Sequence, residues 1–423
     1  MVYFRRVVDS ELDTLLPGLP AIALRGARGV GKTSTALQRA ATVYRLDRPE
    51  VLAIAAADPD RLTSGRPPIL IDEWQLYPAS WDLVRRAVDA EGTPGRLLLT
   101  GSTSPRNPPT HTGAGRIVPV QMRPMTFAER GLETPTVSLA GLLRSRRSDI
   151  GGTTDVGLRD YARAIIGSGF PGLQGLPERA VRAQLTGYVD QIVERDVEEA
   201  GATFRNPPML RRWLAAYAAA VSSTTSFAKI REAATATRIE PPAKGTAARY
   251  ADILESIWIL DPVPAWTPAG TDLRRLTVAP KHQLVDPAIA ASLRGATMDA
   301  LLAGAPAGAL SPRHSTLMGA LFEAAVSLNV RVDAQGAEAR TFHFRSSTGS
   351  HEVDLIVEGM DGRVVGMEVK LVNTPSDEDG RQLRWLRHEI GDRLVDAVIV
   401  TTGREAYRRR DGMAVVPAAL LGP

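Results

Sequence analysis

Residues 26–33 carry the sequence Gly26-Ala27-Arg28-Gly29-Val30-Gly31-Lys32-Thr33. The spacing G-x-x-x-x-G-K-[ST] is that of a phosphate-binding loop, whose backbone N–H groups surround the phosphates of a nucleotide. The apolar run 21–24 before the loop predicts a buried parallel strand, and the composition of 33–44 predicts a helix after it. We expect Lys32 to reach the β- and γ-phosphates and the Thr33 hydroxyl to bind Mg²⁺.

Lysine is rare in this chain, and its positions are informative. The chain has 51 basic residues, but lysine occurs only at Lys32, Lys229, Lys244, Lys281 and Lys370. Arginine therefore serves almost wherever a positive charge is sufficient. Lysine remains where a compact ammonium on a slim stem is required. Two of the five lysines fall in patterns typical of catalytic sites.

The composition is that of a folded protein of two or three domains. The chain has 423 residues, of which 44% are hydrophobic and 23% are charged. No apolar run is long enough to span a membrane, and the N-terminus lacks the apolar core of a signal peptide. The absence of cysteine excludes disulfides and thiolate metal sites and is compatible with a cytoplasmic location. The net charge of +4 is modest.

Two more apolar runs end in polar residues. Residues 69–71 are followed by Asp72 and Glu73, an arrangement in which Asp72 would hold Mg²⁺ through water and Glu73 would activate the attacking water. Residues 97–99 are followed by Thr100, whose side chain is placed to sense the γ-phosphate. With a further expected strand at 51–54, these runs predict a parallel sheet with ligands at its carboxyl edge. The predicted nucleotide contacts are Gly26, Ala27, Arg28, Gly29, Val30, Gly31, Lys32, Thr33, Ser34 and Thr100.

At this point the chain resembles a known family, the bacterial and archaeal AAA-type ATPases that carry a C-terminal domain of the DUF4143 type. The resemblance covers nearly the whole chain, in order. It is carried by 26–33, Ile71-Asp72-Glu73-Trp74-Gln75, Leu99-Thr100-Gly101-Ser102, Gly115-Arg116, Arg123-Pro124-Met125-Thr126-Phe127-Ala128-Glu129, Gly169-Phe170-Pro171 and Pro280-Lys281-His282-Gln283-Leu284-Val285-Asp286-Pro287. The departures are small, since Phe170 stands where the family often has tyrosine and Ser34 where threonine is common.

The resemblance implies an ATP- and Mg²⁺-dependent switch or motor, with a helical segment after the core. It makes Arg116 a candidate contact to the γ-phosphate, either in its own chain or from a neighbouring copy in a homo-oligomer. The alternative for Arg116 is a structural arginine that closes a loop. Arg5 and Arg6 are candidates for the surroundings of the nucleotide base. We therefore predict a P-loop core of the AAA type over residues 1–135.

The middle of the chain is predicted to be helical over 136–200 and similar to a winged helix over 201–265. The latter rests on a helix at 227–236, a longer helix that reaches Leu254, and a strand at 257–260. Thr246 or Arg249 would then face DNA. The alternative is a module that only packs the ends of the protein together, which the few basic residues of this helix favour.

A connector is predicted at 266–312 and an α/β domain at 313–423. A helix from residue 315 carries Glu323, and a hairpin follows it. If the hairpin loop is 360–362, Asp354 lies opposite Glu368, because side chains alternate along a strand. A two-residue turn would shift the register by one and separate the two carboxylates.

These residues resemble the constellation of a PD-(D/E)xK nuclease, with Glu323, Asp354 and Glu368 as ligands for Mg²⁺ or Mn²⁺. Lys370 would position the nucleophile and stabilise negative charge. Gln382, on the following helix, is a candidate substrate contact. The alternative is a hairpin with exposed charges, since the pattern D-x13-E-x-K is loose.

Three hypotheses follow for the whole chain. The first is an ATPase whose nucleotide state controls a DNA-related, nuclease-like C-terminal domain. The second is a signalling or toxin-like switch whose C-terminal domain binds without catalysis. The third is a DNA-binding regulator that uses the winged helix.

Overall fold

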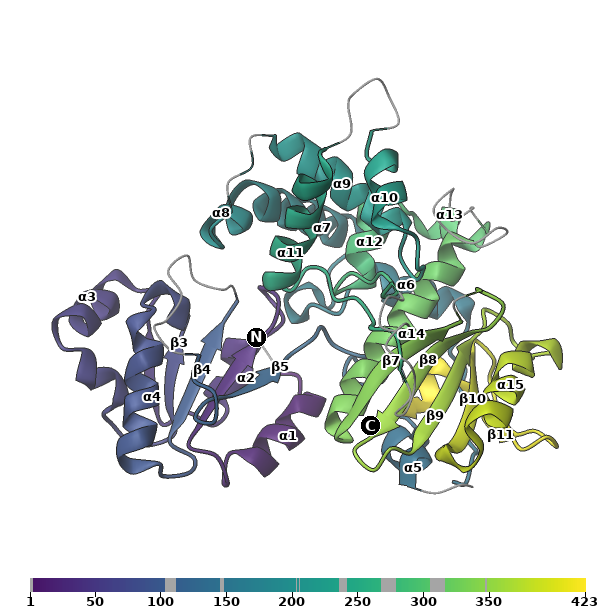
Figure 1. Ribbon diagram of the computed structural model, residues 1–423, viewed down its shortest axis with the longest axis horizontal. Helices are drawn as coiled ribbons and strands as arrows, with labels where there is room; N and C mark the ends of the chain where they lie inside the picture. Colours follow the sequence, from purple (N-terminus) through teal and green to yellow (C-terminus); the bar gives the residue numbers. More distant parts are fainter. Residues whose placement is uncertain are drawn as a thin grey trace.

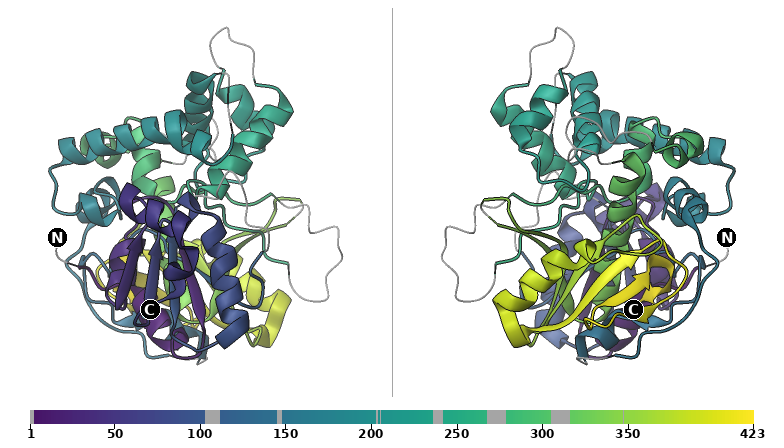
Figure 2. Two further views of the ribbon diagram at one scale, coloured as in Figure 1. Left: turned by 90° about the vertical axis from the view of Figure 1, so that its left-hand side faces the viewer. Right: turned by 90° about the vertical axis from the view of Figure 1, so that its right-hand side faces the viewer.

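The computed structural model describes residues 3–102, 112–144, 148–202, 204, 206–235, 242–267, 279–304, 316–346 and 348–423. Two β-sheets, each with its own helices, lie at opposite sides of the molecule, and a helical region lies above both (Figures 1 and 2). Among the described residues, no helix has the length and apolar character needed to cross a membrane.

The N-terminal sheet has the order β2-β3-β4-β1-β5, and all its pairs are parallel. Its strands are β1 (Ala21–Arg25), β2 (Thr42–Arg45), β3 (Ile69–Asp72), β4 (Leu97–Gly101) and β5 (Val118–Gln121). The accompanying helices are α1 (Val7–Leu15), α2 (Lys32–Leu37), α3 (Pro49–Ala57) and α4 (Ala79–Glu91). Every residue of β3 and β4 is buried, as expected for parallel strands covered on both faces.

Two expectations for this sheet are wrong in detail. The helix expected over 33–44 ends at Leu37, and the β-branched and aromatic residues from Thr42 onward form β2 instead. The strand expected at 51–54 is part of α3, which begins with Pro49 and continues with alanine-rich sequence. In α3 only Ala55 is buried, so this apolar run does not pass through a sheet.

The middle region is a bundle of short helices. They are α6 (Leu158–Ile166), α7 (Glu178–Gln191), α8 (Val197–Glu199), α9 (Pro207–Ala219), α10 (Phe227–Ala233), α11 (Lys244–Ser256), α12 (Pro287–Leu293) and α13 (Met298–Leu302). A π-helical turn, Ile192–Asp196, joins α7 to α8. Helix α12 packs against α6, α7 and α9, and its small apolar residues are buried there.

The strand expected at 257–260 does not form. Helix α11 ends at Ser256, and Trp258 follows with a φ of 64°. The N–H groups of Ile259 and Leu260 turn back to the carbonyl oxygen of Leu254. This segment therefore closes the helix, and only Leu260 makes a β-bridge.

The C-terminal sheet has the order β11-β12-β10-β9-β8-β7. Its strands are β7 (Ala339–Arg345), β8 (Glu352–Gly359), β9 (Val364–Val369), β10 (Leu394–Thr401), β11 (Tyr407–Arg408) and β12 (Ala414–Pro417). Helix α14 (Leu317–Gly336) precedes β7, and α15 (Arg381–Ile390) connects β9 to β10. Strands β7, β8 and β9 form an antiparallel meander, whereas β9, β10 and β12 are parallel.

Residues from the end of the N-terminal core also pack on the C-terminal sheet. Strand β6 (Val137–Ser138) pairs with β13 (Leu421–Gly422), and α5 (Leu139–Arg144) lies against β9 and β10. Thr153 forms a β-bridge with Glu405. The chain thus contributes this early segment to the C-terminal domain before it enters the helical region (Figure 1).

Candidate functional site

The phosphate loop connects β1 to α2. Gly26 has a φ of 147°, and a Cβ at this position would lie 2.1 Å from the carbonyl oxygen of Met122. Gly31, immediately before α2, has a φ of 102°. Side chains other than glycine rarely adopt these conformations, so the two positions determine the shape of the loop.

Lys32 is folded back onto the loop. It is only 5% exposed, and its ammonium donates to the carbonyl oxygens of Gly26 and Ala27 at 2.8 and 2.9 Å. Burial lowers the pKa of Lys32 to about 8, against the attraction of Glu73 and Asp72. Its partners are neutral oxygens, which a phosphate can replace with stronger, charge-assisted bonds.

Thr33, Asp72 and Thr100 meet at the carboxyl edge of the sheet. The Thr33 hydroxyl donates to Oδ1 of Asp72 at 2.7 Å, and the Thr100 hydroxyl donates to the same oxygen. Asp72 ends β3 and is 5% exposed. A hydroxyl beside a carboxylate supplies the oxygen ligands that Mg²⁺ prefers, so the residues present fit this ion.

Glu73 lies next to this group. Its φ of 56° is in the left-handed region, which a glutamate seldom adopts and which is often found at functional sites. Its carboxylate accepts a hydrogen bond from the Gln75 amide. The negative charge of Glu73 acts to raise the pKa of both Lys32 and Arg28.

A pocket of about 170 Å³ adjoins the loop beside α2. Ser34 and Gln38 line it from α2, and the aromatic residues Tyr3 and Phe4 line it from the N-terminal segment. The planar side chains and the position beside the loop suit a nucleotide base. The sequence analysis missed both aromatic residues, because two adjacent aromatic residues before a helix match no nucleotide-binding motif.

Arg6 lines the same pocket, but its guanidinium is already engaged. It donates to the carbonyl oxygens of Val30 and Arg123, and it pairs with Glu129 at 3.2 Å. Arg6 therefore supports the phosphate loop from behind. Arg5 is exposed and lies 3.7 Å from Asp13.

Arg28 connects the loop to the helical region. Its guanidinium pairs with Asp196 at 2.5 Å and with Glu199 at 3.0 Å. The Tyr188 hydroxyl donates to the carbonyl oxygen of Arg28 at 3.0 Å. The three partners lie on α7, the π-helical turn and α8, so the loop contacts one continuous helical stretch.

The structure does not bring Arg116 to the phosphate loop of its own chain. Arg116 precedes β5, whose first residue, Val118, pairs with Ile22 near the start of the parallel strand β1. The phosphate loop lies at the opposite, carboxyl end of β1. Arg116 is 45% exposed and pairs with Asp89 at 2.7 Å. This position is less suited to a γ-phosphate contact within its own chain than to one with a neighbouring copy, and the role of Arg116 stays a prediction.

The C-terminal residues predicted to converge do lie together. Leu355 pairs with Met367, the register in which Asp354 lies opposite Glu368. Glu323 comes from α14, and Lys370 follows β9 and binds Glu368 at 2.6 Å. We name the carboxylates of Glu323, Glu352, Asp354 and Glu368 the C-terminal carboxylate cluster.

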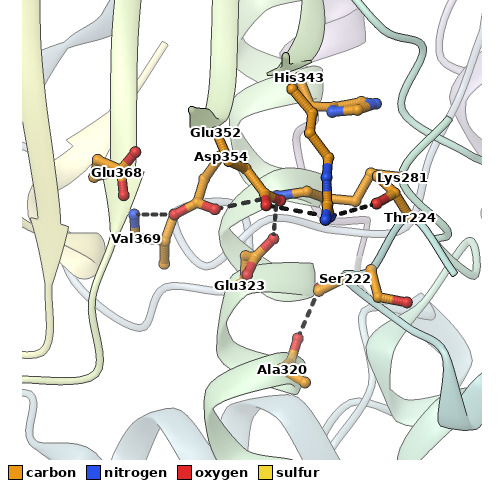
Figure 3. A network of polar contacts seen from close by, with 12 residues as sticks. Ser222, Thr224, Lys281, Ala320, Glu323, His343, Glu352, Asp354, Glu368 and Val369 are labelled. Carbon is orange, nitrogen blue, oxygen red and sulfur yellow. Dashed lines mark hydrogen bonds and ion pairs between the residues drawn. The ribbon is translucent and has the colours of Figure 1, made fainter. Parts of the chain in front are cut away.

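The sequence analysis did not predict that Lys281 lies at the centre of this cluster. Its ammonium lies 2.8 Å from Glu323, 3.1 Å from Asp354 and 3.7 Å from Glu352, and the side chain is 1% exposed (Figure 3). Burial lowers the pKa of Lys281, but the neighbouring carboxylates outweigh it and raise the value. The sequence analysis named Lys281 only as one of five lysines and as part of the motif at 280–287, with no role in this site.

The cluster does not fit a divalent metal ion. Lys281 occupies the point where Glu323 and Asp354 converge, and the second oxygen of Asp354 accepts the N–H of Val369 at 3.0 Å. Burial raises the pKa of Glu323 to about 7 and that of Glu368 to about 8, against the attraction of Lys281 and Lys370. Within the described ranges, no three acidic or histidine side chains are arranged to hold a metal.

Gln382 and Arg249, one of the two residues predicted to face DNA, have other contacts. Oε1 of Gln382 lies 3.1 Å from Nδ1 of His351, at the start of the hairpin. The His351 ring stacks on Trp385, with ring centroids 4.1 Å apart. In the helical region, the Arg249 guanidinium lies 5.8 Å from the centroid of the Phe204 ring.

Comparisons with known families assign the domains. Residues 19–131 match an AAA domain. The chain carries an AAA domain. Residues 158–300 match a domain of unknown function, DUF8612, and residues 318–421 match a second one, DUF4143. The predicted combination of an AAA domain with a C-terminal DUF4143 domain is confirmed. One family model covers 158–300, where the sequence analysis placed parts of three segments.

Two mycobacterial relatives are similar over almost the whole chain. The uncharacterized proteins Mb2031c of Mycobacterium bovis and Rv2008c of Mycobacterium tuberculosis are each 26% identical to it over 428 aligned positions. Each match covers 99% of this chain and 84% of the relative. Among solved structures, the Walker-type ATPase PABY2304 of Pyrococcus abyssi matches with a TM-score of 0.37 and 14% identity, over 69% of this chain and 96% of that one.

Proposed function

We propose that the AAA domain binds and hydrolyses ATP with Mg²⁺. The observation that carries this proposal is the joint arrangement of Lys32 on the glycine loop and of Thr33 and Thr100 on Asp72. A lysine on the glycine loop and hydroxyls beside an aspartate are what a nucleoside triphosphate and its cation require.

Each residue of this site would have its own role in ATP hydrolysis. Mg²⁺, held by the Thr33 hydroxyl near Asp72, would neutralise charge between the β- and γ-phosphates. Lys32 would leave its two carbonyl partners and bind the same phosphates. Glu73, oriented by Gln75, would accept a proton from the attacking water.

A change in the bound nucleotide would be transmitted to the helical region through the residues that pack against the phosphate loop. Phe170 and Pro171 pack against the loop at Gly29 and Gly31. Asp286 holds this turn from behind, because its carboxylate accepts the N–H of Gly169 at 2.8 Å. A phosphate that moved the loop would therefore displace the turn or the helices that hold Arg28.

For the C-terminal domain, the contacts of Lys281 favour a switch without nuclease catalysis. Asp354, Glu368 and Lys370 lie close together, as a nuclease requires, but Lys281 neutralises the carboxylates that would hold the metal. A nuclease would cleave labelled plasmid DNA in Mg²⁺ or Mn²⁺ and lose this activity in Asp354→Ala. We expect no cleavage by the unmodified chain, with or without ATP.

The ATPase proposal is tested by hydrolysis of ATP by the full chain. Lys32→Ala should lower turnover by about 100-fold or more, because the phosphates lose their main cationic contact. The matched control is Lys229→Ala, since Lys229 is an exposed lysine of the helical region. Circular dichroism checks that both variants fold. Unchanged hydrolysis in folded Lys32→Ala would remove the assignment of this site.

A further inference from the structure

We infer that Lys281 is the built-in cation of the C-terminal carboxylate cluster and excludes a divalent metal ion from it. The cluster is then a closed ion-pair site, and it becomes a metal site only when this lysine is removed. The inference does not depend on ATP binding, since it concerns a different domain.

The first argument is the position of the ammonium. It approaches Glu323 from α14, Asp354 from β8 and Glu352 from the start of the same strand. A metal ion bound by these carboxylates would occupy the same space, and it requires about six oxygen ligands. Figure 3 shows Lys281 reaching between Glu323 and Asp354, with Glu368 on the other side of Asp354.

The second argument is charge. Lys281 and Lys370 lie within 4.0 Å of the carboxylates and already compensate much of their negative charge. Burial without a counterion would be costly for either partner, so the ammonium and the carboxylates stabilise one another. A divalent ion would leave the ammonium buried beside a second cation.

The third argument is that the backbone holds Lys281 in place. Its N–H and carbonyl groups bond to Val263 at 2.9 Å in both directions. The next residue, His282, bonds through its backbone to Ser222 and Ser223 at 2.8 Å. The backbone of Lys281 is therefore fixed in place, and its side chain is 1% exposed.

Binding of Mn²⁺ to the full chain, measured by electron paramagnetic resonance without nucleotide, tests this inference. Wild type and Asp354→Asn should bind the same amount of Mn²⁺. Lys281→Met should bind additional Mn²⁺, and Lys281→Met combined with Asp354→Asn should lose it again. The inference fails if Asp354→Asn removes Mn²⁺ from wild type, or if folded Lys281→Met gains none.

A second measurement can overturn the inference even if Lys281→Met does not fold. Because the chain has only five lysines, amine acetylation followed by mass spectrometry reports on each one. In wild type, Lys281 should stay unmodified with and without Mn²⁺, while the exposed Lys229 and Lys244 react. Labelling of Lys281 that matches theirs, or that rises with Mn²⁺, would overturn the inference.

Discussion

Lys32 and Lys281 are both buried lysines, but their surroundings are opposite. Lys32 donates to two neutral carbonyl oxygens, and burial lowers its pKa to about 8. Lys281 donates to carboxylates on two elements of the C-terminal domain, and these raise its pKa despite complete burial. Among the described residues, the Lys32 ammonium has no direct ionic partner, whereas the Lys281 ammonium has three carboxylates within 4 Å.

The difference indicates which site is open to a ligand. A phosphate gives Lys32 an ionic partner, which its two carbonyl contacts do not, so binding there gains charge-assisted bonds. At Lys281 an incoming ligand would have to break ion pairs that already exist. The same residue type therefore marks a binding site in one domain and a closed contact in the other.

The largest expected effect compares a carboxylate from each site. Glu73→Gln should lower ATP turnover by about 10²–10⁴-fold, because an amide cannot accept the proton of the attacking water. ATP should remain bound to this variant in a filter or fluorescence assay. Glu368→Gln, a matched change in the other domain, should leave turnover nearly unchanged. Rapid turnover by Glu73→Gln would assign the base to another residue.

Stability should separate the two lysines directly. Lys281→Met removes the counterion of buried carboxylates and should lower the free energy of unfolding by about 3–5 kcal/mol. Lys32→Met removes a cation with neutral partners and should not lower it measurably. Urea denaturation followed by circular dichroism compares the two variants. Equal losses would show that the two environments do not differ as the contacts indicate.

Much of the N-terminal site was predictable because its signal is local. The glycine spacing before Lys32, and the apolar runs that end at Asp72 and Thr100, each lie within a few residues of sequence. The same reasoning failed at 51–54 and 257–260, since a short apolar run does not distinguish a strand from a helix or a turn.

The C-terminal site was predictable only in part. The hairpin register follows from alternation and loop length, and it placed Asp354 opposite Glu368. Lys281 was not predicted as a member, because it lies 42 residues from Glu323 and 73 residues from Asp354 in sequence. The contacts between Arg28 and the helical region were not predicted either, because the residues involved lie far apart in sequence.

A smaller effect tests whether Arg28 is restrained by the helical region. Asp196→Asn should weaken the hold on the guanidinium and free it for a phosphate. The dissociation constant for ATP should then fall by about fivefold, equivalent to roughly 1 kcal/mol. Fluorescence titration with a labelled ATP analogue measures this change. Glu194→Gln, an exposed carboxylate of the same turn, is the control, and weaker ATP binding in Asp196→Asn would contradict the proposed restraint.

The smallest expected effect concerns Asp333, a third buried titratable group. It lies on α14 with 1% exposure, and its Oδ1 has no hydrogen-bonding partner in the part of the chain that the structure describes. Burial, with Glu129 nearby, raises the pKa of Asp333 well above its ordinary value. Unlike Lys281, this group has no counterion among the residues that the structure describes.

The folded chain therefore binds this proton more tightly than the unfolded chain does. The stability that the proton confers is complete below the unfolded pKa of Asp333 and is lost as pH rises toward the folded value. Asp333→Asn should raise the melting temperature at pH 8 by about 2–4 °C and change it little near pH 4. Asp47→Asn, at an exposed carboxylate, should show no such pH dependence. A melting temperature of Asp333→Asn that differs from wild type equally at both pH values would show that this carboxyl does not titrate with folding.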